Sequence, residues 1–317
     1  MFTKICYRTL TALILALFTA EFANAQAPVG TRASGMAGAY VAVADDASAV
    51  YWNPAGIAAT TFVSVVADVG AQATVAGQLQ RAAGEQDTTA MLAFSATAFG
   101  LAYYRVGTYG TRADEPAGSG SPSREEVRRS VHGITTSTLG VSLLQSITEF
   151  VVVGATPKVM WGSFNGSSTS TFDVDAGAML VVNRLHVGVV AHNLTTPEFE
   201  GVTGEPVELE REVRIGGAWG SGWSGISRFI VSLDSDVMSR PTPSGDRRDV
   251  AAGVETWWLN QRLGLRGGGR RSTIGEPRGA VAAGISVGWK PGMLLEAHVA
   301  RGDAEERSWS VGARMLF

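Results

Sequence analysis

Four histidines are the side chains of this sequence best suited to metal binding or proton transfer. They are His132, His186, His192 and His298. His186 and His192 are expected on one face of one strand, where six residues at ~3.3 Å each separate them by ~20 Å, too far for one metal ion. His298 shares a face with Glu296, but no further ligand or proton-transfer partner is evident. We therefore interpret the histidines as solvated or hydrogen-bonded side chains.

Two aspartate pairs could act as paired catalytic carboxylates. In each pair the members are two residues apart, so both side chains of a pair lie on one face of a strand. Like-charged neighbours on a strand more often face water or a cross-strand arginine, and Arg214 and Arg228 are the candidates. The pairs are Asp173 with Asp175 and Asp234 with Asp236.

Motifs for other reactions are missing from the sequence. No Gly-x-Ser-x-Gly elbow occurs, and the glycines of 264–269 come without a P-loop lysine or a following helix. Asn193 follows His192, so strand alternation places the two on opposite faces. We predict no enzymatic activity, no cofactor and no metal, with an outer-membrane hydrolase as the third alternative.

The composition and the first 25 residues indicate an exported protein. The 26 basic residues do not exceed the 29 acidic ones, so nucleic acid is not expected as a partner. Lys4 and Arg8 precede the apolar stretch 10–20, and Ala23-Asn24-Ala25 is a small-x-small site. This pattern predicts a signal peptide, residues 1–25, that is cleaved after Ala25.

The rest of the chain consists of segments in which apolar and polar residues alternate. Such segments predict an all-β fold, and their short and long connections alternate as in an outer-membrane barrel. We predict a 14-stranded antiparallel transmembrane β-barrel over residues 62–317, with both ends of the chain on the short-turn side. The expected strands are 62–72, 88–98, 100–107, 131–145, 149–161, 170–182, 184–194, 212–220, 226–237, 249–259, 262–270, 279–290, 293–301 and 307–317.

The two faces of these strands differ in the way that a barrel requires. Leu185, Val187 and Val189 alternate with His186 and Gly188. The apolar face would contact lipid and the charged face would line the lumen. A soluble periplasmic barrel or sandwich has the same alternation, and a transmembrane helix over 88–104 is a further alternative. The expected lumen side chains are Asp173, Asp175, Arg214, Arg228, Asp234, Asp236, Glu255, Arg266, Glu296 and His298.

The last strand ends in an aromatic residue. The residues SWSVGARMLF alternate, and Trp309, Gly312 and Phe317 are the expected signal for the barrel assembly machinery. In the longest loop, the charged segment 121–129 predicts a solvated surface that could recognise a partner.

Residues 30–58 read GTRASGMAGAYVAVADDASAVYWNPAGIA. This segment resembles the N-terminal signature of FadL-type outer-membrane proteins and of their shorter PorV/PorQ-like relatives. The resemblance implies a hatch over residues 26–61, inside the barrel, whose movement opens a path for apolar ligands through a gap in the wall. From the residue types alone, the same positions could be purely structural turns. The implied hatch residues are Gly35, Met36, Gly38, Asp45, Asp46, Asn53, Pro54, Ala55 and Gly56.

The resemblance implies passive transport of small hydrophobic compounds across the bacterial outer membrane. The implied partners are outer-membrane lipids, a hydrophobic small-molecule ligand and the barrel assembly machinery. The alternative is a PorV-like scaffold or shuttle that binds a secretion partner. A transporter should have an apolar pocket beside the hatch and a break in strand pairing, whereas a scaffold should have a filled lumen.

Overall fold

The computed structural model describes residues 29–60, 62–73, 87–112, 130–164, 167–200, 206–221, 228–242, 245–275, 277–303 and 306–317. The expected signal peptide and its cleavage site lie outside these residues. So do residues 26–28 and 61 of the expected hatch and the charged loop segment 121–129. None of the helices in the described part of the chain is both long and apolar enough to cross a membrane.

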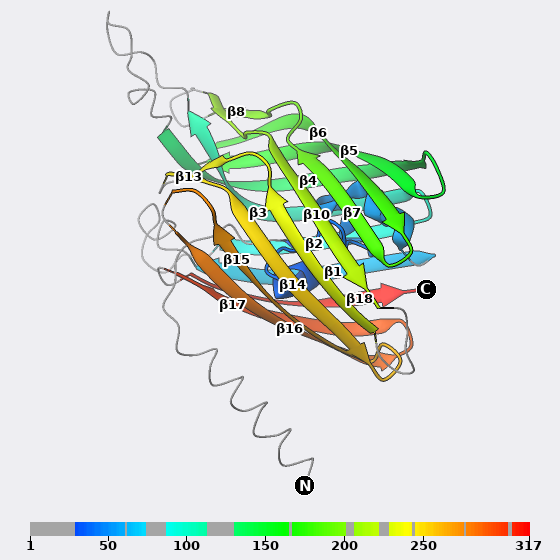
Figure 1. Ribbon diagram of the computed structural model, residues 1–317. Coiled ribbons are helices and arrows are strands. Elements are labelled where there is room, and N and C mark those ends of the chain that lie inside the picture. Colours follow the sequence, from blue (N-terminus) through cyan, green and yellow to red (C-terminus); the bar gives the residue numbers. More distant parts are fainter. Residues whose placement is uncertain are drawn as a thin grey trace, which may run out of the picture.

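The fold is a closed antiparallel β-barrel (Figure 1). Its sheet has sixteen strands in the described residues, of which two form a hairpin on the end of β3, so fourteen make the wall. The predicted fold is confirmed. The wall strands are β1 (Val63–Ala73), β2 (Asp87–Ala96), β3 (Phe99–Arg112), β4 (Ser130–Ser146), β5 (Val151–Phe164), β6 (Ser167–Val182), β7 (Leu185–His192), β10 (Glu212–Gly220), β11 (Arg228–Asp236), β14 (Asp249–Trp258), β15 (Leu263–Ser272), β16 (Gly279–Lys290), β17 (Met293–Gly302) and β18 (Arg307–Leu316).

Each wall strand pairs with its neighbours in sequence, and β1 pairs with β18 to close the barrel. Phe317 and Val63 exchange two backbone hydrogen bonds, 2.9 and 3.2 Å long, at this seam. The C-terminus lies at the end of the barrel with the short turns, at the right of Figure 1. Two small hairpins in long connections were not predicted: β8 (Glu198–Glu200) with β9 (Pro206–Glu208), and β12 (Arg240–Thr242) with β13 (Gly245–Arg247).

Apolar side chains face outward from the wall, as the alternation predicts. Val281, Ile285 and Val287 of β16 are exposed, whereas the intervening Ser286 is buried. Trp258 and Trp289 are exposed beside short turns. The outward face therefore has the composition of a lipid-facing surface.

Two ladders of the described wall are irregular. The register of β16 and β17 shifts between Gly288 and Lys290, and the β4–β5 ladder is interrupted. Strands β4 and β5 pair on both sides of Val141 and Ser142 but not at these two residues. Opposite them lies Pro157, which has no N–H to donate. On the inner side, the hydroxyls of Ser142 and Thr156 are 2.7 Å apart and hydrogen-bonded. The resemblance implies a gap in the wall. The described ladders contain no interruption wider than the one between β4 and β5.

Candidate functional site

The lumen is filled by residues 29–60, which we call the hatch (Figure 1). It contains three short helical elements: α2 (Thr31–Gly35), α3 (Ala49–Trp52) and η1 (Pro54–Ala59). The Asn53 side chain accepts a hydrogen bond from the Ala55 backbone N–H (3.2 Å), and Pro54 occupies the first turn of η1. Asp46 likewise accepts from the Ser48 backbone N–H at 3.0 Å. Such bonds from a side chain to a nearby backbone N–H are typical of Asn and Asp in turns.

One side of the hatch packs against glycines of β4 to β7, which we call the glycine wall. A Cβ atom at Gly177 would lie 2.1 Å from Asn53 Oδ1, and one at Gly154 would lie 2.8 Å from the Ala55 backbone nitrogen. Asn53 Nδ2 donates to the Ala178 carbonyl at 3.2 Å. The hatch backbone can approach these strands closely only because they carry no side chain there. The glycine wall consists of Gly140, Gly154, Gly177 and Gly188.

The opposite side of the hatch is attached to β14, β15, β17 and β18 by buried ion pairs. Arg32 binds both oxygens of Glu255, at 2.8 and 2.6 Å, and also pairs with Asp45 and Asp46. Bidentate guanidinium–carboxylate pairs are the strongest of their kind. We call the whole set the charge network. It consists of Arg32, Asp45, Asp46, Glu255, Arg266, Glu296 and Arg314.

The strand arginines complete the network. Arg314 contacts Asp46 at 3.2 Å and Glu296 at 3.0 Å, and Arg266 contacts Glu296 at 3.2 Å. Trp257 lies beside both guanidinium groups, 5.3 and 5.8 Å from its ring centre. A buried charge that loses its partner costs about 3–5 kcal/mol, so the network holds α2 firmly against this wall.

The ionisation of the hatch groups follows from this environment. Burial opposes the charged form of Arg32, but Asp45 and Glu255 outweigh it and raise its pKa well above the ordinary value. Burial likewise opposes the charge on Asp46, but Arg314 and Arg32 lower its pKa below 3.8. Both groups are therefore charged at neutral pH.

A third region of the hatch, the turn of residues 39–43, is hydrogen-bonded to the wall through β11 and packs against Gly188 of β7 and Gly216 of β10. One carboxylate oxygen of Asp234 accepts the backbone N–H groups of Tyr40 (2.8 Å) and Val41 (2.9 Å). The Ser232 hydroxyl donates to the Ala39 carbonyl at 2.7 Å. We call this segment the tethered turn.

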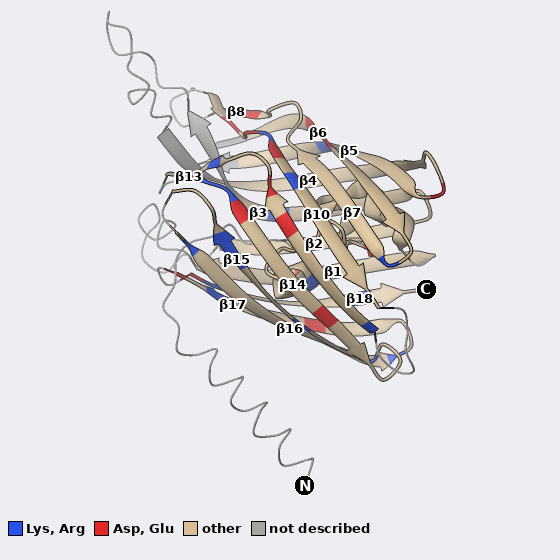
Figure 2. Ribbon diagram, in the orientation of Figure 1, with Lys and Arg blue, Asp and Glu red and all other residues tan. Residues whose placement is uncertain are grey.

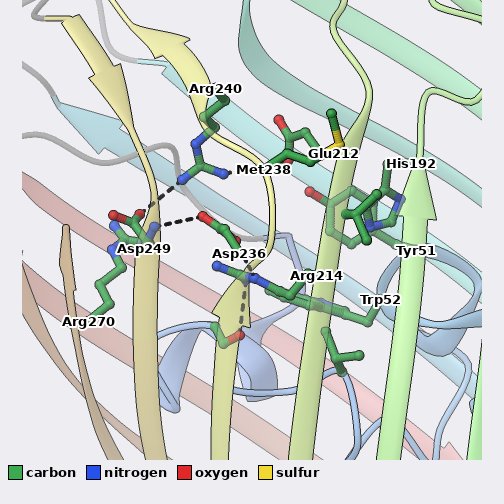
Figure 3. A pocket seen from close by; sticks show the side chains of 13 residues that line it. Tyr51, Trp52, His192, Glu212, Arg214, Asp236, Met238, Arg240, Asp249 and Arg270 are labelled. Atoms are coloured by element: carbon green, nitrogen blue, oxygen red, sulfur yellow. Dashed lines mark hydrogen bonds and ion pairs between the residues drawn. The ribbon is translucent and has the colours of Figure 1, made fainter. Parts of the chain in front are cut away.

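An upper cavity of about 60 Å³ lies on the long-loop side of the tethered turn. Figure 3 shows Tyr51 and Trp52 of the hatch on one side of it and paired charges on the other. The Tyr51 ring stacks on His192 at 5.7 Å, and burial raises the pKa of Tyr51 to about 12. Arg214 binds Asp236, its direct neighbour on β11, at 2.7 Å. The cavity thus combines aromatic surface with neutralised charge.

A lower cavity of about 220 Å³ lies on the short-turn side of the same turn. Ala42 and Val43 of the hatch form its ceiling, and Arg184 and Arg228 line it nearer the barrel end. The two cavities are bounded by the same strands, β7, β10 and β11. The tethered turn lies between them.

The ten expected lumen residues are buried or line these cavities, but some pairings differ from the prediction. Asp173 and Asp175 do not pair with Arg214 or Arg228. They bind Lys158 of β5, at 3.0 and 2.7 Å. Lys158 is directly opposite Asp173 in the β5–β6 register, which the sequence did not reveal.

The remaining expected residues fall into two groups. Gly35, Met36 and Gly38 pack near β14 to β16 or the upper cavity, and Gly56 lies against the Ala44 carbonyl. Trp309 (49% exposed) and Phe317 (64% exposed) face outward. A Cβ at Gly312 would lie 2.7 Å from the Asp68 Cβ and 3.1 Å from Thr31 Oγ1, so this glycine faces the hatch. Recognition of these residues by the assembly machinery stays a prediction.

Three important residues were missed. Arg32 and Tyr51 lie in the hatch, and Arg314 faces inward from β18. The inward position of Arg314 follows from the alternation of the last strand, but its hatch partners do not. Asn193 also departs from simple alternation, because its positive φ of 56° ends β7 and brings its side chain to Lys158 at 3.3 Å.

A serine and a histidine do meet in the lumen. His298 Nδ1 lies 2.6 Å from the Ser310 hydroxyl, which in turn donates to Thr31 Oγ1 of the hatch at 2.8 Å. The pair is buried under the hatch and the histidine has a second serine, Ser308, at 3.3 Å instead of an orienting carboxylate. Among the described residues no cluster of His, Cys, Asp and Glu has the geometry to hold a metal ion.

Solved barrels of similar architecture are known. The "CymD monoaromatic hydrocarbon channel" aligns over 91% of this chain and 97% of its own, with a TM-score of 0.62 and 11% identity. The chain has the fold of these outer-membrane channels. The Pseudomonas putida toluene transporter TodX has a TM-score of 0.55 at 9% identity, covering 93% of this chain and 98% of its own. A Pseudomonas aeruginosa FadL homologue has a TM-score of 0.56 at 12% identity, covering 94% and 100%.

The comparisons based on sequence found one match, which covers part of the chain. The model of one family, described as "F plasmid transfer operon, TraF, protein", matches residues 161–236. No curated protein matches the sequence. The similarity to the solved barrels named above concerns the fold alone.

Proposed function

We propose that this protein is a gated passive channel for small hydrophobic compounds in the bacterial outer membrane. The observation that carries the proposal is the pair of cavities on β7, β10 and β11, with the tethered turn between them. The apolar outer wall supports placement in a membrane, and the aromatic residues of the upper cavity suit an apolar solute.

The proposed route runs down this side of the lumen. An apolar cavity of ~150 Å³ can hold benzene, so the lower cavity has room for a single ring whereas the upper one does not. The tethered turn must therefore move before a solute passes. Its two bonds to a carboxylate and one to a hydroxyl contribute roughly 4–7 kcal/mol, so the open state is rare without solute.

The alternative is a scaffold that binds a secreted protein, and the filled lumen favours it. A scaffold needs no solute route, so the tethered turn would then serve only to fill the barrel.

Uptake of radiolabelled toluene by cells distinguishes the two functions. The cells would express either this chain or no barrel in an otherwise identical outer membrane. The channel predicts uptake that is faster with the barrel and faster still when Asp234→Ala removes the tether. Equal rates in all three strains, with the barrel folded and present in the outer membrane, would reject the channel and leave the scaffold.

A further inference from the structure

Three outward-facing arginines form a row near the long-loop end of the wall. They come from β15, β17 and β18, which lie within three interstrand steps, or ~14 Å, of one another. Arg301 is directly opposite Arg307, and Arg271 is opposite Gly279 of the intervening strand. Figure 2 shows the blue segments at the long-loop ends of β15 and β17. We call Arg271, Arg301 and Arg307 the arginine row.

The row lies directly above the apolar band of the wall. Val281, 42% exposed, is paired with Arg301, and Trp309, 49% exposed, lies two residues below Arg307 on the same face. Arg301 and Arg307 occupy directly opposite positions on neighbouring strands. The arginine row lies at the edge of the apolar band. When a barrel crosses a membrane, arginines at this level meet anionic headgroups.

An open groove of about 800 Å³ adjoins the row. Val250, Ala252 and Val281 form its apolar part, and Arg271 and Asp303 lie at its rim. Asp303 already accepts a hydrogen bond from the Gly279 backbone N–H at 2.6 Å. The groove thus places an apolar surface beside a cationic rim, which matches a lipid that has both acyl chains and phosphates.

We propose that the arginine row and this groove bind a phosphorylated lipid of the outer leaflet, with the phosphates on the arginines and an acyl chain in the groove. The inference rests on the outer-membrane placement in the proposed function but not on solute conduction. A barrel that conducts nothing would still bind the lipid.

The test is native mass spectrometry of the purified barrel in detergent, titrated with bis-phosphorylated lipid A. The variant Arg271→Gln/Arg307→Gln removes two charges from the row. The control Arg262→Gln/Lys290→Gln removes two charges from exposed positions at the short-turn end. We expect the first variant to bind about thirtyfold more weakly and the control to bind like wild type. Toluene uptake and folding should be unchanged in both.

Four results would overturn the proposal. The first is equal binding by wild type and the arginine-row variant, and the second is an equal loss in the control. In the third, lipid A without phosphates binds as tightly as the phosphorylated form, which would assign the contact to acyl chains alone. If inorganic phosphate displaced the lipid at matched concentration, the site would bind free anions and the assignment to a lipid would be wrong.

Discussion

The charge network and the glycine wall hold the two sides of one hatch by different physical means. Ion pairs are directional and strongly penalise the loss of one partner, whereas glycine packing depends on shape and penalises the addition of atoms. The tethered turn lies between these regions and contacts both. The Tyr40 hydroxyl accepts from Arg32 and donates to Asp46, and a Cβ at Gly188 would lie 2.8 Å from the Val41 carbonyl oxygen. Its hydrogen bonds to the wall go to Asp234 and Ser232. We infer that the hatch opens at this turn while α2 stays docked.

The largest effect is expected at the charge network. Arg32→Met leaves Glu255 buried without its bidentate partner and should weaken hatch docking by about 3–5 kcal/mol. Hydrogen exchange of α2, followed by mass spectrometry, measures this change. Arg262→Met, at an exposed turn, is the control and should leave exchange unaltered. Unchanged exchange in Arg32→Met would mean that the network does not hold the hatch.

An added methyl group tests the glycine wall. Gly177→Ala places a Cβ 2.1 Å from Asn53 Oδ1 and should cost about 1–3 kcal/mol through displacement of η1. Gly217→Ala is the matched control, since no atom lies within 4 Å of its Cβ position. Thermal unfolding in detergent compares the two. Equal melting temperatures would show that close packing at Gly177 is unimportant.

A smaller effect is expected at the tether. Asp234→Asn keeps an acceptor oxygen but loses the charge, so we expect a loss of about 1–2 kcal/mol and faster opening of the turn. The rate at which a thiol reagent labels Val41→Cys reports this opening. Asp246→Asn, at an exposed position, should not change the labelling rate. Slower labelling in Asp234→Asn would contradict the role of the carboxylate.

The smallest of these effects is expected from acid, which should weaken the charge network. Because the docked hatch lowers the Asp46 pKa below 3.8, it binds fewer protons there than a released hatch does. Docking is therefore fully favoured above about pH 4 and weakens as the pH falls below that value. Fluorescence of Trp52 in the variant that retains this tryptophan alone should shift in this range. A shift that persists in Asp46→Asn would have another origin.

Most of the wall could be predicted from the sequence because each strand shows its own alternation of faces. The strands 212–220 and 279–290 were predicted with the bounds that the structure has. The pairing of lumen charges could not be predicted, since it depends on register and on hatch groups far away in sequence. Lys158 with Asp173, and Arg32 with Glu255, are examples.

The hatch could be located by resemblance, but not the way in which it is held. Nothing in the local sequence of Gly177 or Gly154 distinguishes them from other strand glycines, because their partners are atoms of residues 53–55, which are far away in sequence. Asp234 was expected to be a charged residue of the lumen, but its role as a tether was not expected. Its role depends on two backbone N–H groups, which leave no trace in the sequence.

Two cysteine cross-links distinguish a moving tethered turn from a hatch that stays rigid. The Cβ position at Gly216 lies 3.1 Å from the Val41 Cβ and 2.4 Å from Asp234 Oδ1, so the Asp234 carboxylate must shift before this pair forms a disulfide. The Cβ position at Gly253 lies 3.0 Å from the Met36 Cβ, and this pair needs a smaller adjustment. Toluene uptake is measured for both double-cysteine variants before and after reduction. We expect the disulfide of Val41→Cys/Gly216→Cys to block toluene uptake until it is reduced. The Met36→Cys/Gly253→Cys barrel should conduct toluene in both the oxidised and the reduced state. Uptake that continues through the oxidised Val41→Cys/Gly216→Cys barrel would contradict a gate at the tethered turn.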